Sequence, residues 1–138
     1  MTDATLVDTS VLLDLATDDP AWGEWSQRQM EAAGGRGPLL INDVIYAEAS
    51  VRFATVEAVD AFLATVAVER EAMPDAALFL AGKAHRRYRQ GGGTRRGVLS
   101  DFFVGAHAAV RGVALLTRDP SRVRGYFPTV RIVAPTVA

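Results

Sequence analysis

Cysteine is absent from the 138 residues, and histidine and lysine are scarce, with only His85, His107 and Lys83. The missing cysteine excludes disulfides and thiolate metal sites. Two histidines are too few to favour a zinc site. Any metal ion must therefore be bound mainly by carboxylate oxygens, and the chain contains 16 Asp and Glu residues to provide them.

Long hydrophobic runs are also absent. Apolar residues make up 49% of the chain, yet no run approaches the ~20 residues needed to cross a bilayer. The first residues, "MTDATLVD", have neither the basic region nor the apolar segment of a signal peptide. We therefore expect a cytoplasmic protein with no membrane contact, and the length favours a single domain over residues 1–138.

Acidic and basic residues divide the chain into two halves. Residues 1–70 contain twelve acidic and four basic residues, whereas residues 71–138 contain four acidic and eleven basic ones. The basic residues are densest in "GKAHRRYRQGGGTRRG", which contains no acid. Such a stretch suits a polyanion such as nucleic acid, although a solvated helix face followed by a glycine loop explains it equally well.

Short apolar segments alternate with segments of helical periodicity. Strands are predicted at "ATLVDT", "PLLIND", "VALLTRD" and "TVRIVAP", with a further short strand around residues 66–68. Helices are predicted at "SVLLDLA", "AWGEWSQRQMEAA", "DVIYAEASVRF", "VEAVDAFLATV", "PDAALFLAGKAHRRYRQ" and "LSDFFVGAHAAVRG", with Asn42 as the N-cap of the third and Gly112 ending the last. This alternation predicts an α/β fold, a three-layer α/β/α sandwich with a central, mostly parallel sheet.

Two carboxylates follow predicted strands. Asp8 ends the first strand, and Asp119 follows the segment "VALLTR". Binding sites in an open parallel sheet form beyond the carboxyl ends of the strands, so both side chains should reach the same edge. Each also has a purely structural interpretation, because Asp8 can cap the helix that begins near Ser10 and Asp119 can cap a helix at Pro120.

Glu48 lies on an apolar helical face. It follows Ile45 by three residues and Val44 by four, so these side chains share one side of the helix. A charge in this place is costly unless it has a partner. The alternative is an exposed pair with Arg52, four residues further along the helix.

Asp101 opens another predicted helix. The positive end of the helix dipole favours an acid there, and Ser100 is a ready cap, so a structural role is plausible. However, Asp101 and Asp119 are the only acids after residue 75, among eleven bases. Carboxylates that converge in such a field repel one another, and a divalent cation removes the repulsion. Oxygen-only ligation suits Mg²⁺ or Mn²⁺, so an acidic pocket with a basic rim suits cleavage of phosphodiesters.

The order of these four acids resembles the acidic constellation of PIN-domain ribonucleases. The stretches "LVDTSVLLDL", "INDVIYAE", "LSDFFVGAHA" and "LLTRDPSRVRGYFPTVRIVAP" are similar in particular to the VapC toxins of bacterial toxin–antitoxin pairs, over residues 5 to about 135. The resemblance implies a PIN-like sandwich and a Mg²⁺- or Mn²⁺-dependent endoribonuclease. It also implies inhibition by a cognate antitoxin that binds operator DNA, and a homodimer.

Residue roles follow from this resemblance by position. The resemblance implies three metal ligands, binding directly or through water: Asp8, Asp101 and Asp119. Glu48 would be a further ligand or orient the attacking water, and Thr9 and Thr117 match hydroxyl positions that support the pocket. Hydrolysis by an activated water would leave a 5′-phosphate and a 3′-hydroxyl. RNA binding would use an aromatic ring for stacking and a set of cations for flanking phosphates, namely Tyr88 with Arg86, Arg87, Arg89, Arg95 and Arg96.

Two other functions fit parts of the pattern. One is a non-catalytic module with a PIN-like fold, in which the acids cap helices and the basic half binds nucleic acid or a protein. A magnesium phosphotransferase fits less well, because the single lysine, Lys83, lies in a predicted helix and not near a late strand end. The apolar helix "VEAVDAFLATV" suits either a dimer interface or packing on its own sheet.

Overall fold

The computed structural model describes residues 3–95 and 98–136. Its first half contains β1 (Thr5–Val7), α1 (Thr9–Ala16), α2 (Gly23–Arg36), β2 (Leu39–Ile41), α3 (Asp43–Ser50), α4 (Val56–Thr65) and β3 (Val68–Arg70). Its second half contains α5 (Asp75–Gln90), α6 (Leu99–Arg111), β4 (Ala114–Leu116), α7 (Ser121–Tyr126) and β5 (Ile132–Val133).

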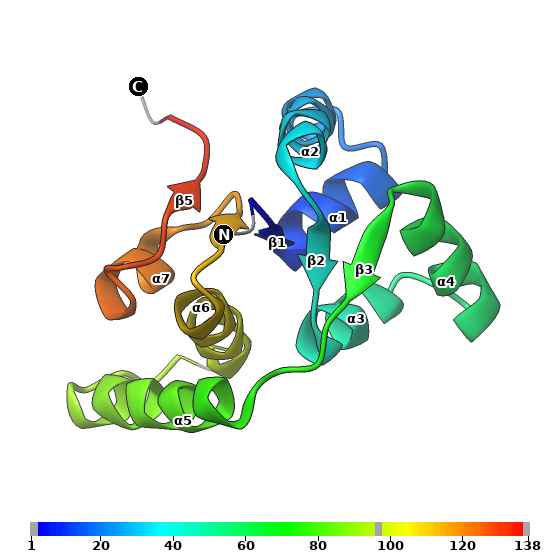
Figure 1. The fold of residues 1–138 in the computed structure, drawn as a ribbon. Coiled ribbons are helices and arrows are strands. Elements are labelled where there is room, and N and C mark those ends of the chain that lie inside the picture. Colours follow the sequence, from blue (N-terminus) through cyan, green and yellow to red (C-terminus); the bar gives the residue numbers. More distant parts are fainter. Residues whose placement is uncertain (1–2, 96–97, 137–138) are drawn as a thin grey trace.

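The strands form one sheet in the order β3-β2-β1-β4-β5, and every neighbouring pair in the described residues is parallel. Parallel neighbours need crossover connections, which the helices provide. Helices lie on both sides of the sheet, with α2 on one side and α5 and α6 on the other (Figure 1). The predicted α/β architecture is confirmed, with a sheet that is parallel throughout.

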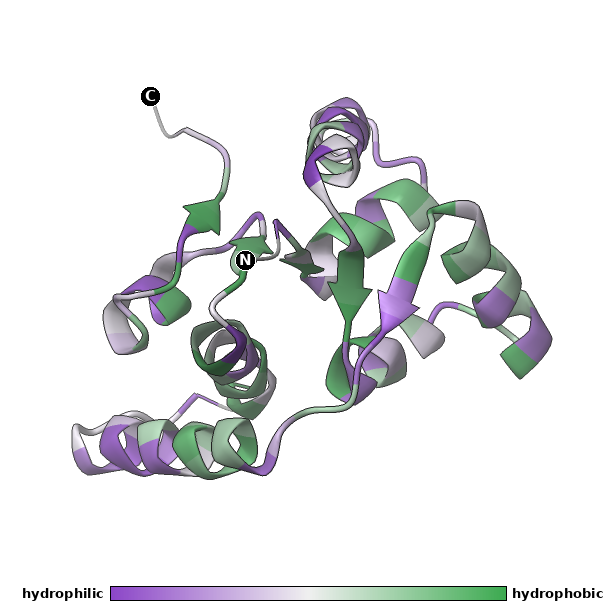
Figure 2. Cartoon of the chain, viewed as in Figure 1, coloured by the Kyte–Doolittle hydropathy of each residue, from purple (hydrophilic) through white to green (hydrophobic). Residues whose placement is uncertain are grey.

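The core is built on the three central strands. Each residue of β1, β2 and β4 is buried, because strands covered on both faces by helices have no solvent side. Figure 2 shows β2 as a hydrophobic strand and the helices around it as a mixture of hydrophobic and hydrophilic segments. Within the described ranges, no helix combines the length and apolarity that crossing a membrane requires.

Several element boundaries differ from the sequence prediction. Helix α2 continues through Gly34 and Gly35 and ends only at Gly37, where a Cβ atom would lie 2.5 Å from the carbonyl oxygen of Asp3. Strand β3 begins at Val68, two residues later than expected, and α7 is a short helix that the periodicity did not indicate. The two predicted terminal signals are confirmed. The Asn42 Oδ1 accepts from the backbone N–H of Ile45 at 2.9 Å, and Gly112 has φ of 66°.

Candidate active site

The four predicted acids all lie at the carboxyl edge of the sheet. Asp8 directly follows β1, Asp119 lies three residues after β4, and Glu48 is in α3, the helix that follows β2. Asp101 comes from the first turn of α6. Elements distant in sequence therefore bring their carboxylates toward one edge, as expected for an open parallel sheet.

Asp8 is the most constrained of these residues. One carboxylate oxygen, Oδ1, accepts from the backbone N–H of Thr9 at 2.8 Å, so Asp8 is indeed the N-cap of α1. The other, Oδ2, accepts from the hydroxyls of Thr117 at 2.7 Å and Ser10 at 3.2 Å. The capping interpretation and the site interpretation are thus compatible, because the two oxygens serve different partners.

Glu48 is held by a hydroxyl from another helix. Its Oε1 accepts from the Thr9 hydroxyl at 2.8 Å, across 39 residues of sequence. In the described part of the chain no ion pair joins Glu48 to Arg52, so the surface-pair interpretation finds no support. The contact through Thr9 directs Glu48 toward the residue next to Asp8.

Asp101 carries an ion pair that the sequence did not reveal. The Arg122 Nη1 donates to Asp101 Oδ2 at 2.8 Å, and the two side chains are 18% and 41% exposed. Arg122 comes from α7, and its guanidinium also lies 5.5 Å from the centre of the Tyr88 ring. One of the four acids is therefore already neutralised in part by the protein itself.

Asp119 is exposed and attached to the site through its backbone. Its N–H donates to the Thr117 hydroxyl oxygen at 3.1 Å, the same hydroxyl that donates to Asp8. The helix behind it, α7, has Pro120 at its N-cap position and no side-chain cap. The carboxylate accepts only from the Ser121 hydroxyl, at 3.3 Å, among the contacts of the described residues.

The acids influence one another electrostatically. Burial raises the pKa of the Asp8 carboxyl, and the charges of Asp101 and Glu48 raise it further against hydrogen bonds from Thr117 and Thr9. Burial also raises the pKa of Asp101, with contributions from Asp119 and Glu48, although Arg122 opposes the shift. The charged forms of these two carboxylates are thus destabilised mainly by burial and to a smaller extent by the other carboxylates, and a bound cation would favour the charged forms.

The donor chemistry of this pocket fits a hard divalent cation, since all four side chains offer carboxylate oxygens. The side chains are not yet gathered for one. No group of three or more His, Asp or Glu side chains in residues 3–95 and 98–136 is close enough to hold a metal ion. Binding would require the carboxylates to rotate inward and Asp101 to exchange its contact with Arg122 for the cation.

The predicted RNA-binding residues lie mainly at the end of α5. Arg86, Arg87 and Arg89 are exposed on its last turns, and Arg95 is exposed in the loop that follows. Arg96 lies outside the described residues. Figure 2 shows this end of α5 as hydrophilic.

Tyr88 is placed differently from what stacking on a base requires. Its ring packs near Phe102 at 5.7 Å and Tyr126 at 6.5 Å between centroids, and its hydroxyl accepts from the N–H of Arg95 at 3.1 Å. The ring is therefore part of an aromatic cluster that links α5 to α6 and α7. Its role in stacking stays a prediction.

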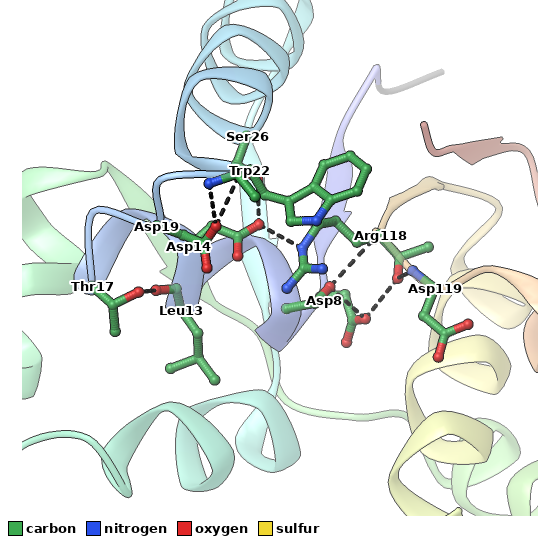
Figure 3. Close-up of polar contacts among 12 residues, drawn as sticks. Asp8, Leu13, Asp14, Thr17, Asp19, Trp22, Ser26, Arg118 and Asp119 are labelled. Atoms are coloured by element: carbon green, nitrogen blue, oxygen red, sulfur yellow. Dashed lines mark hydrogen bonds and ion pairs between the residues drawn. The ribbon is translucent and has the colours of Figure 1, made fainter. Parts of the chain in front are cut away.

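Sequence reasoning missed a second set of residues beside the acids. Arg118, between Thr117 and Asp119, donates through Nε to buried Asp14 at 2.7 Å. Asp14 also accepts from the Ser26 hydroxyl at 2.7 Å, and the Arg118 guanidinium lies 5.3 Å from the centre of the Trp22 ring. Figure 3 shows Arg118 between Trp22, Asp14 and Asp8. The signal in the sequence was an arginine at a strand end, directly beside Asp119.

Comparisons with known proteins agree with this geometry. The PIN domain family model matches residues 5–124, so the chain belongs to the PIN domain family. No curated protein matches the chain.

Solved structures share the fold at low sequence identity. VapBC2 from Rickettsia felis, bound to a DNA fragment from its promoter, has a TM-score of 0.71 at 14% identity, covering 95% of this chain and 98% of that chain. DNA-bound VapBC from Salmonella typhimurium has a TM-score of 0.69 at 17% identity, covering 97% and 98%. A toxin–antitoxin complex from Klebsiella pneumoniae has a TM-score of 0.68 at 18% identity, covering 94% and 95%.

Proposed function

We propose that this protein is a metal-dependent endoribonuclease and the toxin of a toxin–antitoxin pair. The observation that supports the activity most is the placement of Asp8, Glu48, Asp101 and Asp119 at one edge of the sheet. There burial, with smaller contributions from neighbouring carboxylates, raises the pKa values of Asp8 and Asp101. Structural acids are normally neutralised by partners, whereas perturbed groups at one sheet edge are typical of functional sites. Membership of the PIN domain family points the same way.

Asp8, Asp101 and Asp119 would hold Mg²⁺ or Mn²⁺, directly or through water, and Glu48 would complete the pocket. A bound cation of this kind activates water and offsets the charge that develops on a phosphodiester. The supporting residues keep the oxygens in place. The Thr117 hydroxyl fixes Oδ2 of Asp8, and the Thr9 hydroxyl fixes Oε1 of Glu48.

The substrate would be RNA, bound through its phosphates. Exposed guanidinium groups attract a polyanion and release its counterions, so binding should weaken as salt rises. The residues proposed for this contact are Arg86, Arg87, Arg89, Arg95 and Arg96. Arg87 lies 5.1 Å from the centre of the Tyr126 ring, which places it on the aromatic cluster beside Arg122.

The decisive experiment is cleavage of total RNA by the purified protein with Mn²⁺, with and without a chelator. The wild-type protein should cut only without chelator and should leave 5′-phosphate ends. Asp8→Asn and Asp101→Asn should each lose at least about a hundredfold in rate, since removal even of residues that only support metal ligands costs ~10–100-fold.

Asp75→Asn provides the matched control. Asp75 is an exposed acid in the first turn of α5, as Asp101 is in the first turn of α6, so both substitutions lose the same interaction with a helix dipole. Asp75→Asn should cleave at the wild-type rate. Full activity of Asp101→Asn would refute the assignment of the site.

An antitoxin and a second copy of this chain are the proposed partners, in the cytoplasm. Apolar side chains are exposed on several helices, including Val56 at 63% and Phe79 at 68% exposure. Partner proteins commonly cover such side chains. The similar fold of the Rickettsia felis and Salmonella typhimurium VapBC complexes supports an antitoxin as one of them.

One observation favours a second candidate, a non-catalytic binding module. The ion pair between Arg122 and Asp101 occupies one of the two carboxylate oxygens that Asp101 could offer to a metal ion. In a binding module this pair would persist, and Mn²⁺ would neither bind nor promote cleavage. The cleavage experiment above separates the two candidates.

A further inference from the structure

A second pocket adjoins the acidic site at the carboxyl edge. Its volume is about 620 Å³, within the range of ~300–1,000 Å³ that small-molecule sites occupy. Arg118 and Pro120, which flank Asp119 in sequence, form one part of its lining. The remainder comes from Trp22 before α2, from Arg124 of α7, and from Ala134, Pro135 and Thr136 after β5.

The aromatic wall of this pocket is fixed in place by several contacts. The backbone N–H of Trp22 donates to Asp19 Oδ1 at 2.8 Å, and the Trp22 ring meets Trp25 edge-on at 6.1 Å between centroids. Arg118 is held against the ring by its 2.7 Å bond to buried Asp14. Figure 3 shows this arrangement, with Asp119 beside it. A ring that is already ordered loses little entropy when a ligand binds.

The charge of the pocket suits an anion. None of its lining residues is acidic, and two are arginines. Arg118 is paired with Asp14, but the exposed Arg124 side chain forms no ion pair within the described residues. An aromatic ring beside an unpaired guanidinium is the combination that binds a nucleotide of single-stranded nucleic acid, with the base on the ring and the phosphate on the cation.

We propose that this pocket binds a nucleotide of single-stranded RNA next to the phosphodiester that is cut. The base contacts Trp22, and Arg124 binds the adjoining phosphate. This inference rests on the proposed ribonuclease function and adds to it a defined subsite, apart from the arginines of α5.

The test uses the tryptophans as reporters of binding. The chain contains two, Trp22 and Trp25, so Trp25→Phe leaves Trp22 as the sole tryptophan emission. A mixed-sequence oligoribonucleotide of about 12 nucleotides, a length that single-stranded binding modules cover, is added with a chelator present so that no cleavage occurs. Trp22 fluorescence should fall to a saturating level, and the midpoint should move to higher RNA concentration as salt increases.

Arg124→Ala tests the phosphate contact, and Arg131→Ala is its matched control. Both arginines are exposed, but Arg131 lines a separate pocket with Asp3 and Gly112. Arg124→Ala should weaken RNA binding measured by anisotropy severalfold to tenfold, in the range expected when a charge-assisted contact is lost. Arg131→Ala should bind as the wild type does.

Each outcome decides the proposal. Unchanged Trp22 emission, or equal RNA affinity for Arg124→Ala and Arg131→Ala, would overturn the subsite even if the protein cleaves RNA. Quenching by a polyglutamate peptide but not by RNA would also overturn it, in favour of an acidic protein segment. Quenching by RNA in a protein that never cleaves with Mn²⁺ would refute the proposed catalytic function while supporting nucleotide binding in this pocket.

Discussion

Two polar clusters lie among the helices of this protein. In one an acid is paired with a cation, and in the other acids lie near one another. In the first, buried His107 joins Asn42 at 3.1 Å through Nδ1 and Glu71 at 2.7 Å through Nε2, and Glu71 is paired with Arg111. The second is the acidic site, where Asp8 and Asp101 lie near other carboxylates; hydrogen bonds from Thr117 and Thr9 oppose the effect at Asp8, and Arg122 opposes it at Asp101.

The pKa shifts express the same contrast. The hydrogen bond from Arg111 lowers the pKa of Glu71, with a smaller contribution from His107. Burial and neighbouring charges raise the pKa values of Asp8 and Asp101. In the first cluster, residues of the chain itself pair with the acid, and these contacts stabilise the fold. In the second, the ion pair within the described residues is that of Arg122 with Asp101, and acids with raised pKa values are typical of functional sites.

Removing the charge of Glu71 from the cluster around His107 should have the largest effect on stability. Glu71→Gln loses the ion pair with Arg111 and should lower the free energy of unfolding by about 2 kcal/mol. The loss is not larger because both partners are partly exposed to solvent, which weakens the pair. The cost should be full at neutral pH and shrink as pH falls below the usual glutamate range, because protonation breaks the same pair. Urea unfolding at several pH values measures the loss of stability and its dependence on pH.

Glu69→Gln is the control for that substitution. Glu69 is exposed on β3, two residues earlier, and in the described residues it has no ion pair. Its removal should leave the free energy of unfolding unchanged. Equal stability of the two variants would show that the network around His107 contributes nothing.

Binding of a cation at the acidic site should have the next largest effect on stability. Mn²⁺ at ten times its dissociation constant should stabilise the wild-type protein by about 1.4 kcal/mol, a rise in Tm of roughly 5 °C. The shift should disappear in Asp101→Asn and persist in Asp75→Asn. A thermal scan of the three proteins tests this, and an equal shift in all three would place the metal elsewhere.

The two clusters should also respond to pH with opposite signs. Because the pKa of Asp8 is raised on folding, the metal-free protein loses stability as pH rises from the unfolded value of 3.8 through the folded pKa. Asp8→Asn removes this loss, so its stability relative to the wild type should increase over that interval. A decrease in the stability of Asp8→Asn relative to the wild type as pH rises over this interval would contradict the raised pKa of Asp8.

The smallest expected effect concerns Arg122, which is paired with Asp101 in the acidic site. Arg122→Gln frees Asp101 from its 2.8 Å ion pair, so Mn²⁺ should bind about twofold more tightly in the absence of RNA. This twofold change corresponds to ~0.5 kcal/mol for a partly exposed ion pair. Arg111→Gln, which breaks the pair with Glu71, should leave the Mn²⁺ affinity unchanged. Calorimetric titration distinguishes the two variants, and weaker Mn²⁺ binding by Arg122→Gln would show that Arg122 supports the site.

Much of this architecture could be predicted from local patterns. Apolar runs marked β1, β2 and β4, and periodicity marked α1 to α6, because burial on two faces and burial on one face leave different spacings in the sequence. The placement of Asp8 and Asp119 at one edge followed from the rule for parallel sheets. The end of α2 could not be predicted from Gly34 and Gly35, because the helix continues through both to Arg36. The lack of room for a Cβ atom at Gly37 depends on the packing of Asp3, which is distant in sequence.

The sequence by itself determined the types of residue that the candidate site contains, the order of the helices and strands, and the edge of the sheet at which the four acids lie. Only the tertiary structure decided their partners: Arg122 for Asp101, Thr9 for Glu48, and buried Asp14 for Arg118. Strand and helix signals arise from neighbours a few positions apart. These contacts join residues 21 to 104 positions apart, so their existence depends on how whole elements pack.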